Sequence, residues 1–174
     1  FETEAGELPD LRNLSSAYEL ANLSFGQGDL LATPVQISGL INAIASGGEY
    51  VKPSLVEGFV NENRQYIKKN KIEFNRVISQ KTAAYIKSCM IESIESGTSV
   101  LGKPEIGGAG AKTATAETGI VKDEHFIYQT WFAGFFPKDH PKYSVIVFVE
   151  DGESGGTTCA PVFKFIADKL NSLK

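Results

Sequence analysis

Apolar residues recur at helical spacing in three stretches of the chain. The first begins with the signals of a helix start. Thr33 can cap the helix, Pro34 suits its first turn, and Gln36 can complete a capping box with Thr33. Its apolar positions are Ile37, Leu40, Ile41 and Ile44. Because Gly47 and Gly48 then interrupt the pattern, we predict a helix that begins after Thr33 and ends at these glycines.

The two later stretches also predict helices. Ser79 is a cap for the second, which is expected to run to about residue 96 before Gly97 stops it. Its buried stripe consists of Ile86, Met90 and Ile94. A last helix is expected after Thr157 or Thr158, with Pro161 in its first turn. Its apolar stripe consists of Val162, Phe163, Ile166, Leu170 and Leu173.

Strand patterns dominate the region between the last two helices. We predict strands at residues 111–118, 129–136 and 143–150, of which the last two are rich in aromatic and β-branched residues and form a hairpin of largely buried strands. Residues 50–60 and 65–69 are expected to be two exposed strands around a polar turn. Three antiparallel strands with helices packed on them predict an α+β fold.

The beginning of the chain carries weaker signals. Residues 1–12 are acidic, contain Pro9, and are expected to form a loop. Residues 20–25 fit either a short strand or the end of a short helix. Because the chain opens on an acidic segment without an initiator methionine, we expect it to start inside a larger protein.

Composition narrows the class of protein. The 174 residues suit one domain with a sizeable core, and the net charge of -4 argues against nucleic acid as the main partner. No apolar run approaches the roughly 20 residues that span a bilayer. Cys89 and Cys159 lack metal-binding spacing, so we expect two small buried hydrophobes, no metal site and no cofactor.

The strongest chemical signal is the segment GAKTATAETG at residues 110–119. Small residues let a backbone approach a ligand closely, Lys112 supplies positive charge, and the threonines can donate hydrogen bonds to an anion. The segment is not a nucleotide-binding phosphate loop, because Ala111 stands at its last glycine and the alternating small and hydroxylated residues favour a strand. We therefore predict an anion-binding strand edge around Lys112.

No complete catalytic set is visible elsewhere in the chain. A serine nucleophile needs a base within hydrogen-bond reach, and no Gly-x-Ser-x-Gly elbow occurs. His125 and His140 are the candidate bases, but both stand in polar segments and are expected to be surface residues. Asp151 and Glu153 could form an acid pair or a cation site, although a solvated loop is the expectation.

A series of motifs resembles those of monofunctional (class B) penicillin-binding transpeptidases. Lys112-Thr113-Ala114 resembles their Lys-Thr-Gly motif, with alanine in place of glycine, and residues 115–119 continue their KTGTAETG strand. Four further segments occur in the same order as in that family, where they read GQG…LATPLQ, AIANGG, AWFAGFAP and GG…AAPIFKEI. They are, in that order, residues 26–36, 43–48, 131–137 and 155–163.

This resemblance implies that residues 1–174 are the C-terminal portion of a single transpeptidase domain. In that family a nucleophilic serine within Ser-x-x-Lys, and then a Ser-x-Asn motif, precede Lys-Thr-Gly. No serine in this sequence is followed by lysine three residues later or by asparagine two residues later. We therefore expect the N-terminal portion of the domain, with both motifs, to be absent from this chain, and the chain alone to be inactive.

The resemblance also implies roles for the segment around Lys112. The family cross-links peptidoglycan stem peptides that end in D-Ala-D-Ala, and β-lactams acylate the same serine. Lys112 is expected to carry positive charge into the cleft, and the hydroxyls of Thr113 and Thr115 are expected to bind the substrate carboxylate. The N–H of Thr115 is expected to be one oxyanion-hole donor. Ala114, which replaces the glycine, is expected to be ordinary extended backbone.

The resemblance further implies partners and a location. Stem peptides, β-lactams and the N-terminal half of the same domain are the expected partners, a glycan-polymerising synthase is a further candidate, and the expected location is the extracytoplasmic face of a bacterial membrane. Two alternatives remain open: a non-catalytic relative that binds muropeptides or partner proteins, and a β-lactam sensor domain. The residues encoded before Phe1 discriminate between these functions.

Overall fold

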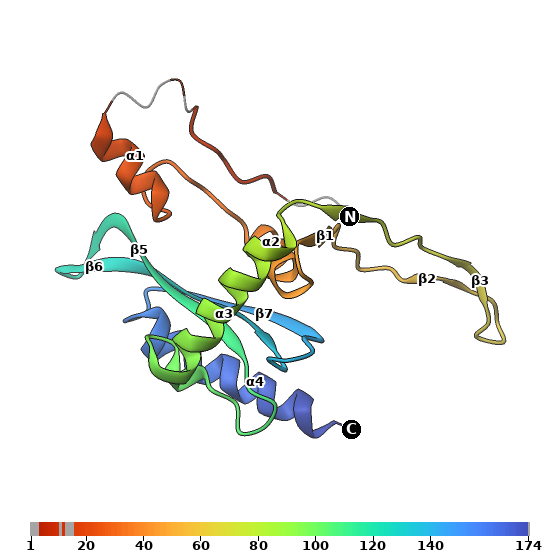
Figure 1. The fold of residues 1–174 in the computed structure, drawn as a ribbon. Helices are drawn as coiled ribbons and strands as arrows, with labels where there is room; N and C mark the ends of the chain where they lie inside the picture. The colour runs from red at the N-terminus through yellow and green to blue at the C-terminus, as the bar shows by residue number, and fades with distance from the viewer. Residues whose placement is uncertain (1–3, 11, 13–15, 174) are drawn as a thin grey trace.

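A three-stranded antiparallel sheet organises the chain in a computed structural model that describes residues 4–10, 12 and 16–173 (Figure 1). Its strands are β5 (Gly110–Lys122), β6 (His125–Phe136) and β7 (Tyr143–Glu150), in the order β5-β6-β7. β5 and β6 are longer than predicted, because their pairing resumes beyond a register shift between Glu117 and Val121. The α+β fold is confirmed.

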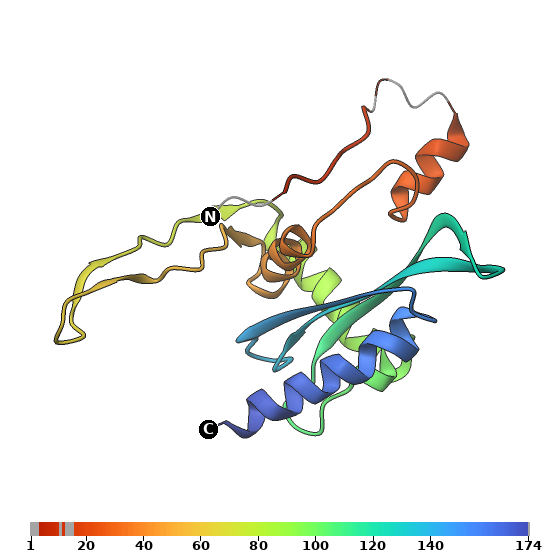
Figure 2. The same cartoon turned by 180° about the vertical axis from the view of Figure 1, so that it is seen from behind.

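Helices cover both faces of this sheet (Figures 1 and 2). α4 (Ala160–Ser172) lies on one face, where its Phe163 packs on Phe132 of the central strand with ring centroids 4.8 Å apart. α2 (Pro34–Ala45) and α3 (Gln80–Ser96) cover the other face, where Phe135 joins a second buried cluster. Neighbouring strand residues point to opposite faces, so the apolar run of β6 supplies both cores.

The helix starts confirm the capping signals in two of three cases. Thr33 and Gln36 form both bonds of the capping box at the start of α2, and the Ser79 hydroxyl accepts from the N–H of Thr82 at the start of α3. Of the two alternatives for residues 20–25, the structure has the helix, α1 (Ala17–Ser24). Residues 4–10 contain no helix, whereas residues 1–3 and 11 of the expected loop lie outside the described residues.

The predicted start of the last helix is wrong. Neither Thr157 nor Thr158 caps it; its N-cap is Cys159, which makes no side-chain capping bond, and Ser154 instead caps the turn before it by accepting from the N–H of Thr157 at 3.1 Å. Gly155–Cys159 then form a π-helical turn, η3, that leads into α4. The turn starts early because Gly155 lies directly on the sheet, with no room for a side chain beside the carbonyl oxygens of Trp131 and Ala114.

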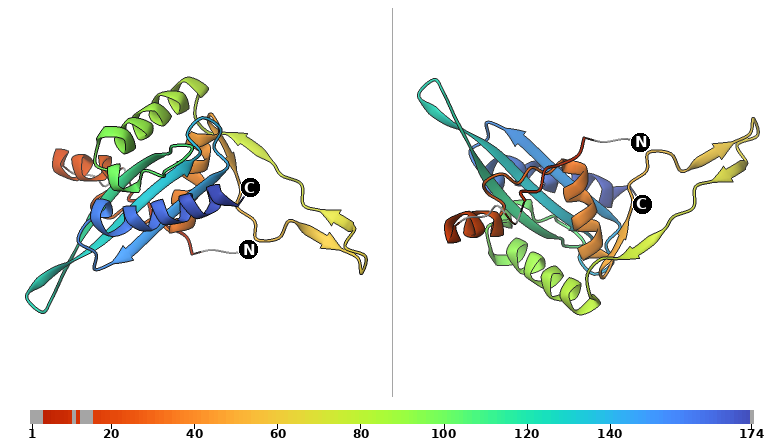
Figure 3. Two further views of the ribbon diagram at one scale, coloured as in Figure 1. Left: turned by 90° about the horizontal axis from the view of Figure 1, so that it is seen from below. Right: turned by 90° about the horizontal axis from the view of Figure 1, so that it is seen from above.

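The predicted strand at residues 50–60 is also wrong, because it is split between two small sheets. β1 (Glu49–Val51) pairs with the unforeseen β4 (Phe74–Arg76), whereas β2 (Gly58–Val60) pairs with β3 (Tyr66–Lys69). Pro53, which lacks an N–H for a strand ladder, lies in the break. The β2–β3 hairpin extends away from the main sheet (Figure 3).

One cysteine also differs from expectation. Cys159 is fully buried, as expected, and its sulfur contacts the Thr130 hydroxyl. Cys89, which was also expected to be buried, lies exposed on α3. Neither forms a disulfide. None of the helices in the described part of the chain is long and apolar enough to cross a membrane.

Candidate active site

The four candidate residues of the Lys112 segment lie side by side on an edge strand. β6 pairs with β5 along one side, and no strand of the described chain pairs with the other side of β5. Ala111 is fully buried, but Lys112, Ala114 and Thr115 are exposed and Thr113 is half-buried. The strand therefore leaves the core after Ala111, and the candidate residues 112–115 lie on its open edge.

Hydrogen bonds show which backbone groups face the open edge. The carbonyl of Ala111 accepts from the hydroxyl of Ser99, 3.4 Å away, and the carbonyl of Thr113 accepts from the Lys112 ammonium. In an antiparallel ladder, alternate residues direct both N–H and C=O to the same side. Thr115 therefore also directs its N–H and C=O away from β6, because the register shift comes only after Glu117.

Lys112 reaches this edge from the opposite face of the strand. Strict alternation separates its side chain from that of Thr113, but its ammonium turns round the rim to the Thr113 carbonyl. Among the ion pairs formed by the described residues, none involves Lys112. An exposed ammonium with no carboxylate partner beside it can attract an anionic ligand to the edge.

The two threonine hydroxyls are held in different ways. Thr113 Oγ1 donates to Thr98 Oγ1 at 3.1 Å. Thr115 Oγ1 accepts from the N–H of Gly155 at 3.3 Å. Because a hydroxyl has a single hydrogen and this bond uses a lone pair, Thr115 keeps its hydrogen for a further acceptor.

Ala114 shows no sign of strain. It pairs with Trp131 in the regular part of the ladder, and the non-glycine residues with left-handed backbone in the described chain lie elsewhere. They are Arg64, Asp123, Glu124 and Asp151. Extended backbone accepts alanine as readily as glycine, so the departure from the Lys-Thr-Gly pattern demands no shift of the strand.

The loop that leads into β5 is fastened to α4. The N–H of Glu105 donates to Asp168 at 2.8 Å, and Lys164 bridges the carboxylates of Glu105 and Asp168. Burial alone would raise the pKa of the Asp168 carboxyl. The hydrogen bonds from the Glu105 N–H and the Lys164 ammonium outweigh this effect, so the pKa of Asp168 lies below its usual value. These contacts fix the start of the edge strand relative to the helix beneath it.

The other candidate groups do not join the edge. His125 forms a half-exposed ion pair with Asp151, 3.4 Å apart, at the far end of the sheet, where His125 pairs with Lys122 rather than with residues near Lys112. His140 and Glu153 are both exposed in loops. In residues 4–10, 12 and 16–173, no group of three or more histidine, cysteine, aspartate or glutamate side chains is placed to hold a metal ion.

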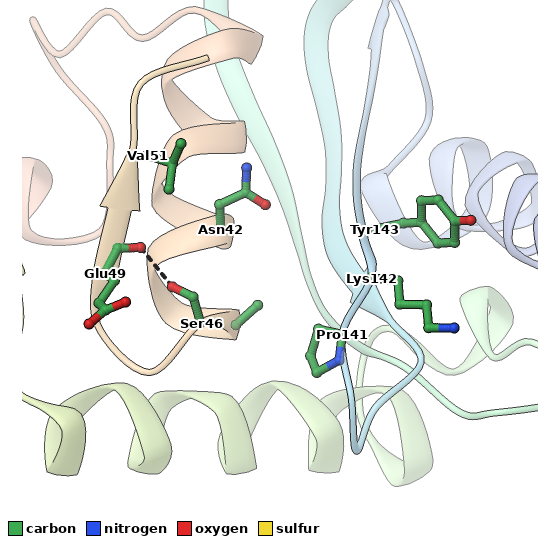
Figure 4. A pocket seen from close by; sticks show the side chains of 8 residues that line it. Asn42, Ser46, Glu49, Val51, Pro141, Lys142 and Tyr143 are labelled. Carbon is green, nitrogen blue, oxygen red and sulfur yellow. Dashed lines mark hydrogen bonds between the residues drawn. The ribbon is translucent and has the colours of Figure 1, made fainter. Parts of the chain in front are cut away.

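A small cavity of about 240 Å³ lies at the opposite edge of the sheet, between the end of α2 and the turn before β7. Figure 4 shows Asn42 and Ser46 on α2 near Pro141, whereas the side chains of Lys142 and Tyr143 extend away from α2. The Ser46 hydroxyl is already bonded to the Glu49 carbonyl. Polar groups therefore do not converge here as they do along β5.

Two residues that contact the edge, Gly155 and Thr98, were not predicted from the sequence. Gly155, which supports Thr115, was visible only as half of a Gly-Gly pair in the resemblance. Thr98, which contacts Thr113, follows the glycine that ends α3 and carries no pattern that singles it out. Both are brought to β5 by tertiary packing.

Comparisons with known proteins identify the family of this chain. Residues 2–168 match the family model described as the penicillin binding protein transpeptidase domain. The chain is 31% identical over 154 residues to "Peptidoglycan D,D-transpeptidase PbpA" of Mycolicibacterium smegmatis, an alignment that covers 84% of this chain and 30% of that protein.

Two solved structures share the fold. A ceftriaxone acyl-enzyme complex of penicillin-binding protein A from Mycobacterium tuberculosis superposes with a TM-score of 0.78 at 27% identity, covering 93% of this chain and 37% of that one. Penicillin-binding protein 3 of the same organism gives 0.79 at 25% identity, with 97% and 41% covered. The chain thus spans well under half the length of these relatives, and it belongs to the penicillin-binding protein transpeptidase domain family.

Proposed function

We propose that this chain is the C-terminal portion of the transpeptidase domain of a serine-type peptidoglycan D,D-transpeptidase. The name of the mycobacterial relative and the acyl-enzyme state of a solved neighbour support this activity. The observation that carries the proposal is the open edge of β5, where the Thr115 N–H, the Thr113 and Thr115 hydroxyls and the Lys112 ammonium are available to one ligand.

The reaction is acyl transfer from a stem peptide that ends in D-Ala-D-Ala. A serine oxygen attacks the penultimate carbonyl carbon, the peptide bond to the last D-Ala breaks, and that residue leaves as a free amino acid after its nitrogen takes up a proton. An amine of a neighbouring stem then attacks the ester and restores the serine hydroxyl. The nucleophilic serine and its lysine, and the Ser-x-Asn serine, belong to residues that precede Phe1 in this proposal.

Each edge group has a distinct task. The Thr115 N–H donates to the oxygen that becomes negative in the tetrahedral intermediate, and the Ser-x-x-Lys serine's own N–H supplies the second donor. The exposed edge of β5 pairs with the extended substrate backbone, as an added strand would. The hydroxyls of Thr113 and Thr115 bind the terminal carboxylate, and the positive charge of Lys112 stabilises both this anion and the bound Ser-x-Asn serine.

The same proposal assigns partners and a place of action. Stem peptides and β-lactams occupy the groove, the N-terminal half of the domain forms its opposite wall, and a glycan-polymerising synthase supplies the strands to be cross-linked. The enzyme then works at the extracytoplasmic face of the membrane, where peptidoglycan is assembled.

Labelling with a fluorescent penicillin tests this function. The whole protein, with the sequence that precedes Phe1, should form a covalent adduct on a serine in a Ser-x-x-Lys motif, and the isolated 174-residue chain should form none. Mass spectrometry of tryptic peptides locates the adduct. A whole protein that resists labelling at saturating penicillin would contradict the proposal and favour a non-catalytic relative. An adduct on a residue of the 174 would contradict the assignment of the nucleophile to the residues that precede Phe1.

A further inference from the structure

Thr98 occupies an unusual position beside the proposed carboxylate site. It follows Gly97, which ends α3, and its hydroxyl accepts the hydrogen bond from Thr113 at 3.1 Å although the two residues are 15 positions apart. Thr98 is exposed, so its hydroxyl is not there to satisfy a buried polar group. Burial therefore does not explain why these two hydroxyls bond to each other at the open edge of β5.

The segment around Thr98 is held rigidly. Its neighbour Ser99 is fully buried, bonds to the Ser93 hydroxyl at 2.9 Å and to the carbonyl of Ala111, and its N–H donates to the Ser93 carbonyl. On the other side, a side chain at Gly156 would come within 3.0 Å of the Thr98 carbonyl. Thr98 is therefore fixed between the end of α3, the start of β5 and the turn before α4.

We propose that Thr98 is a positioning residue that sets the orientation of the Thr113 hydroxyl for an anionic carboxylate, an inference that rests on the proposed function. In the structure the Thr113 hydroxyl donates its hydrogen to Thr98. When a carboxylate arrives, the Thr98 side chain and the Thr113 hydroxyl reorient, so that Thr98 donates to Thr113 and Thr113 donates to the anion. Such a chain of hydroxyls strengthens the terminal bond, because each donor polarises the next.

This role predicts an effect on binding rather than on chemistry. The carboxylate lies away from the scissile carbonyl and is held equally in the ground state and the transition state. Loss of uniform binding raises the dissociation constant of the first complex and leaves the rate constant of acylation unchanged. Removing one link of the chain should weaken that complex about five- to tenfold, the effect of losing one hydrogen bond of about 1 kcal/mol between neutral groups.

Stopped-flow acylation of the whole protein by penicillin G tests the inference. Thr98→Val keeps the shape and removes the hydroxyl, and it should raise the dissociation constant about five- to tenfold with an unchanged acylation rate constant. Thr98→Ser restores a hydroxyl and should return the constant to within about twofold of the wild-type value. Thr82→Val is the matched control, because it removes one member of the exposed Ser79–Thr82 hydroxyl pair at the other end of the same helix.

The outcomes separate the two proposals. If the wild-type protein is acylated but Thr98→Val binds penicillin G as the wild type does, the role of Thr98 is wrong and the proposed function stands. If serine fails to rescue, or if Thr98→Val slows the acylation rate constant, Thr98 acts through the general structure of the site and the inference is wrong. A wild-type protein that is not acylated at all overturns both.

Discussion

β5 and β6 are neighbouring strands of similar length, yet they use their residues for opposite purposes. β6 is buried along its second half and supplies Phe132 and Phe136 to one core and Phe135 to the other. β5 is buried only at its first two residues and then presents small and hydroxylated side chains at an open edge. The sheet therefore separates core packing, carried by its central strand, from the open edge to which we assign ligand binding in the proposed function.

The largest expected effect concerns the stability of the central strand. Phe132 is fully buried against Phe163 and Gly102, so Phe132→Ala should lower the free energy of unfolding of the domain by about 3–5 kcal/mol. Phe126→Ala is the control on the same strand; because Phe126 is exposed, its loss should cost about 0.5 kcal/mol or less. Urea unfolding of the whole protein measures the free energy of unfolding of both variants. Equal losses of stability would contradict the claim that the buried half of β6 carries the core and its exposed end does not.

The next effect concerns the charge at the edge. Lys112→Met keeps the length of an exposed side chain and removes its charge, so acylation by penicillin should fall about 100-fold or more while unfolding is nearly unchanged. Lys122→Met, an exposed lysine at the far end of the same strand, is the control and should retain the wild-type rate. An equal loss in both variants would mean that overall charge, and not the position of Lys112, determines the rate.

The smallest effect concerns the alanine at the glycine position of the motif. Because Ala114 has ordinary extended backbone, Ala114→Gly should change the acylation rate less than about threefold and lower the free energy of unfolding by about 0.5–1 kcal/mol, through the added freedom of the unfolded chain. Parallel acylation and urea measurements check this. A gain in acylation of more than tenfold would show that the methyl group obstructs the edge.

The sequence predicted the parts of the molecule whose cause is local. The capping box at Thr33 and Gln36 predicts α2, and the apolar runs predict β6 and β7, because short-range hydrogen bonds and burial determine these elements. The π-helical turn before α4 escaped prediction, since it depends on the close approach of Gly155 to strands about 24 and 41 residues earlier in the chain. The split of residues 50–60 escaped for a similar reason, because the partner of β1 comes from beyond the β2–β3 hairpin.

The candidate site divides in the same way. Lys112, Thr113, Ala114 and Thr115 are contiguous, so one sequence motif identified them together. Their supports come from the end of α3 and from the turn before α4, and only the folded chain brings Thr98 and Gly155 to the strand. Sequence alone could therefore name the candidate residues on the strand but not the residues that contact them from other elements.

In the proposed function, the open edge of β5 is the acyl-binding wall of the active site. The most direct test is a crystal structure of the whole protein acylated by penicillin G. We predict that the acyl carbonyl oxygen lies about 2.7–3.1 Å from the Thr115 N–H nitrogen, the distance expected of an oxyanion-hole donor. An acyl group whose carbonyl oxygen contacts another element and leaves the Thr115 N–H without a ligand would contradict it.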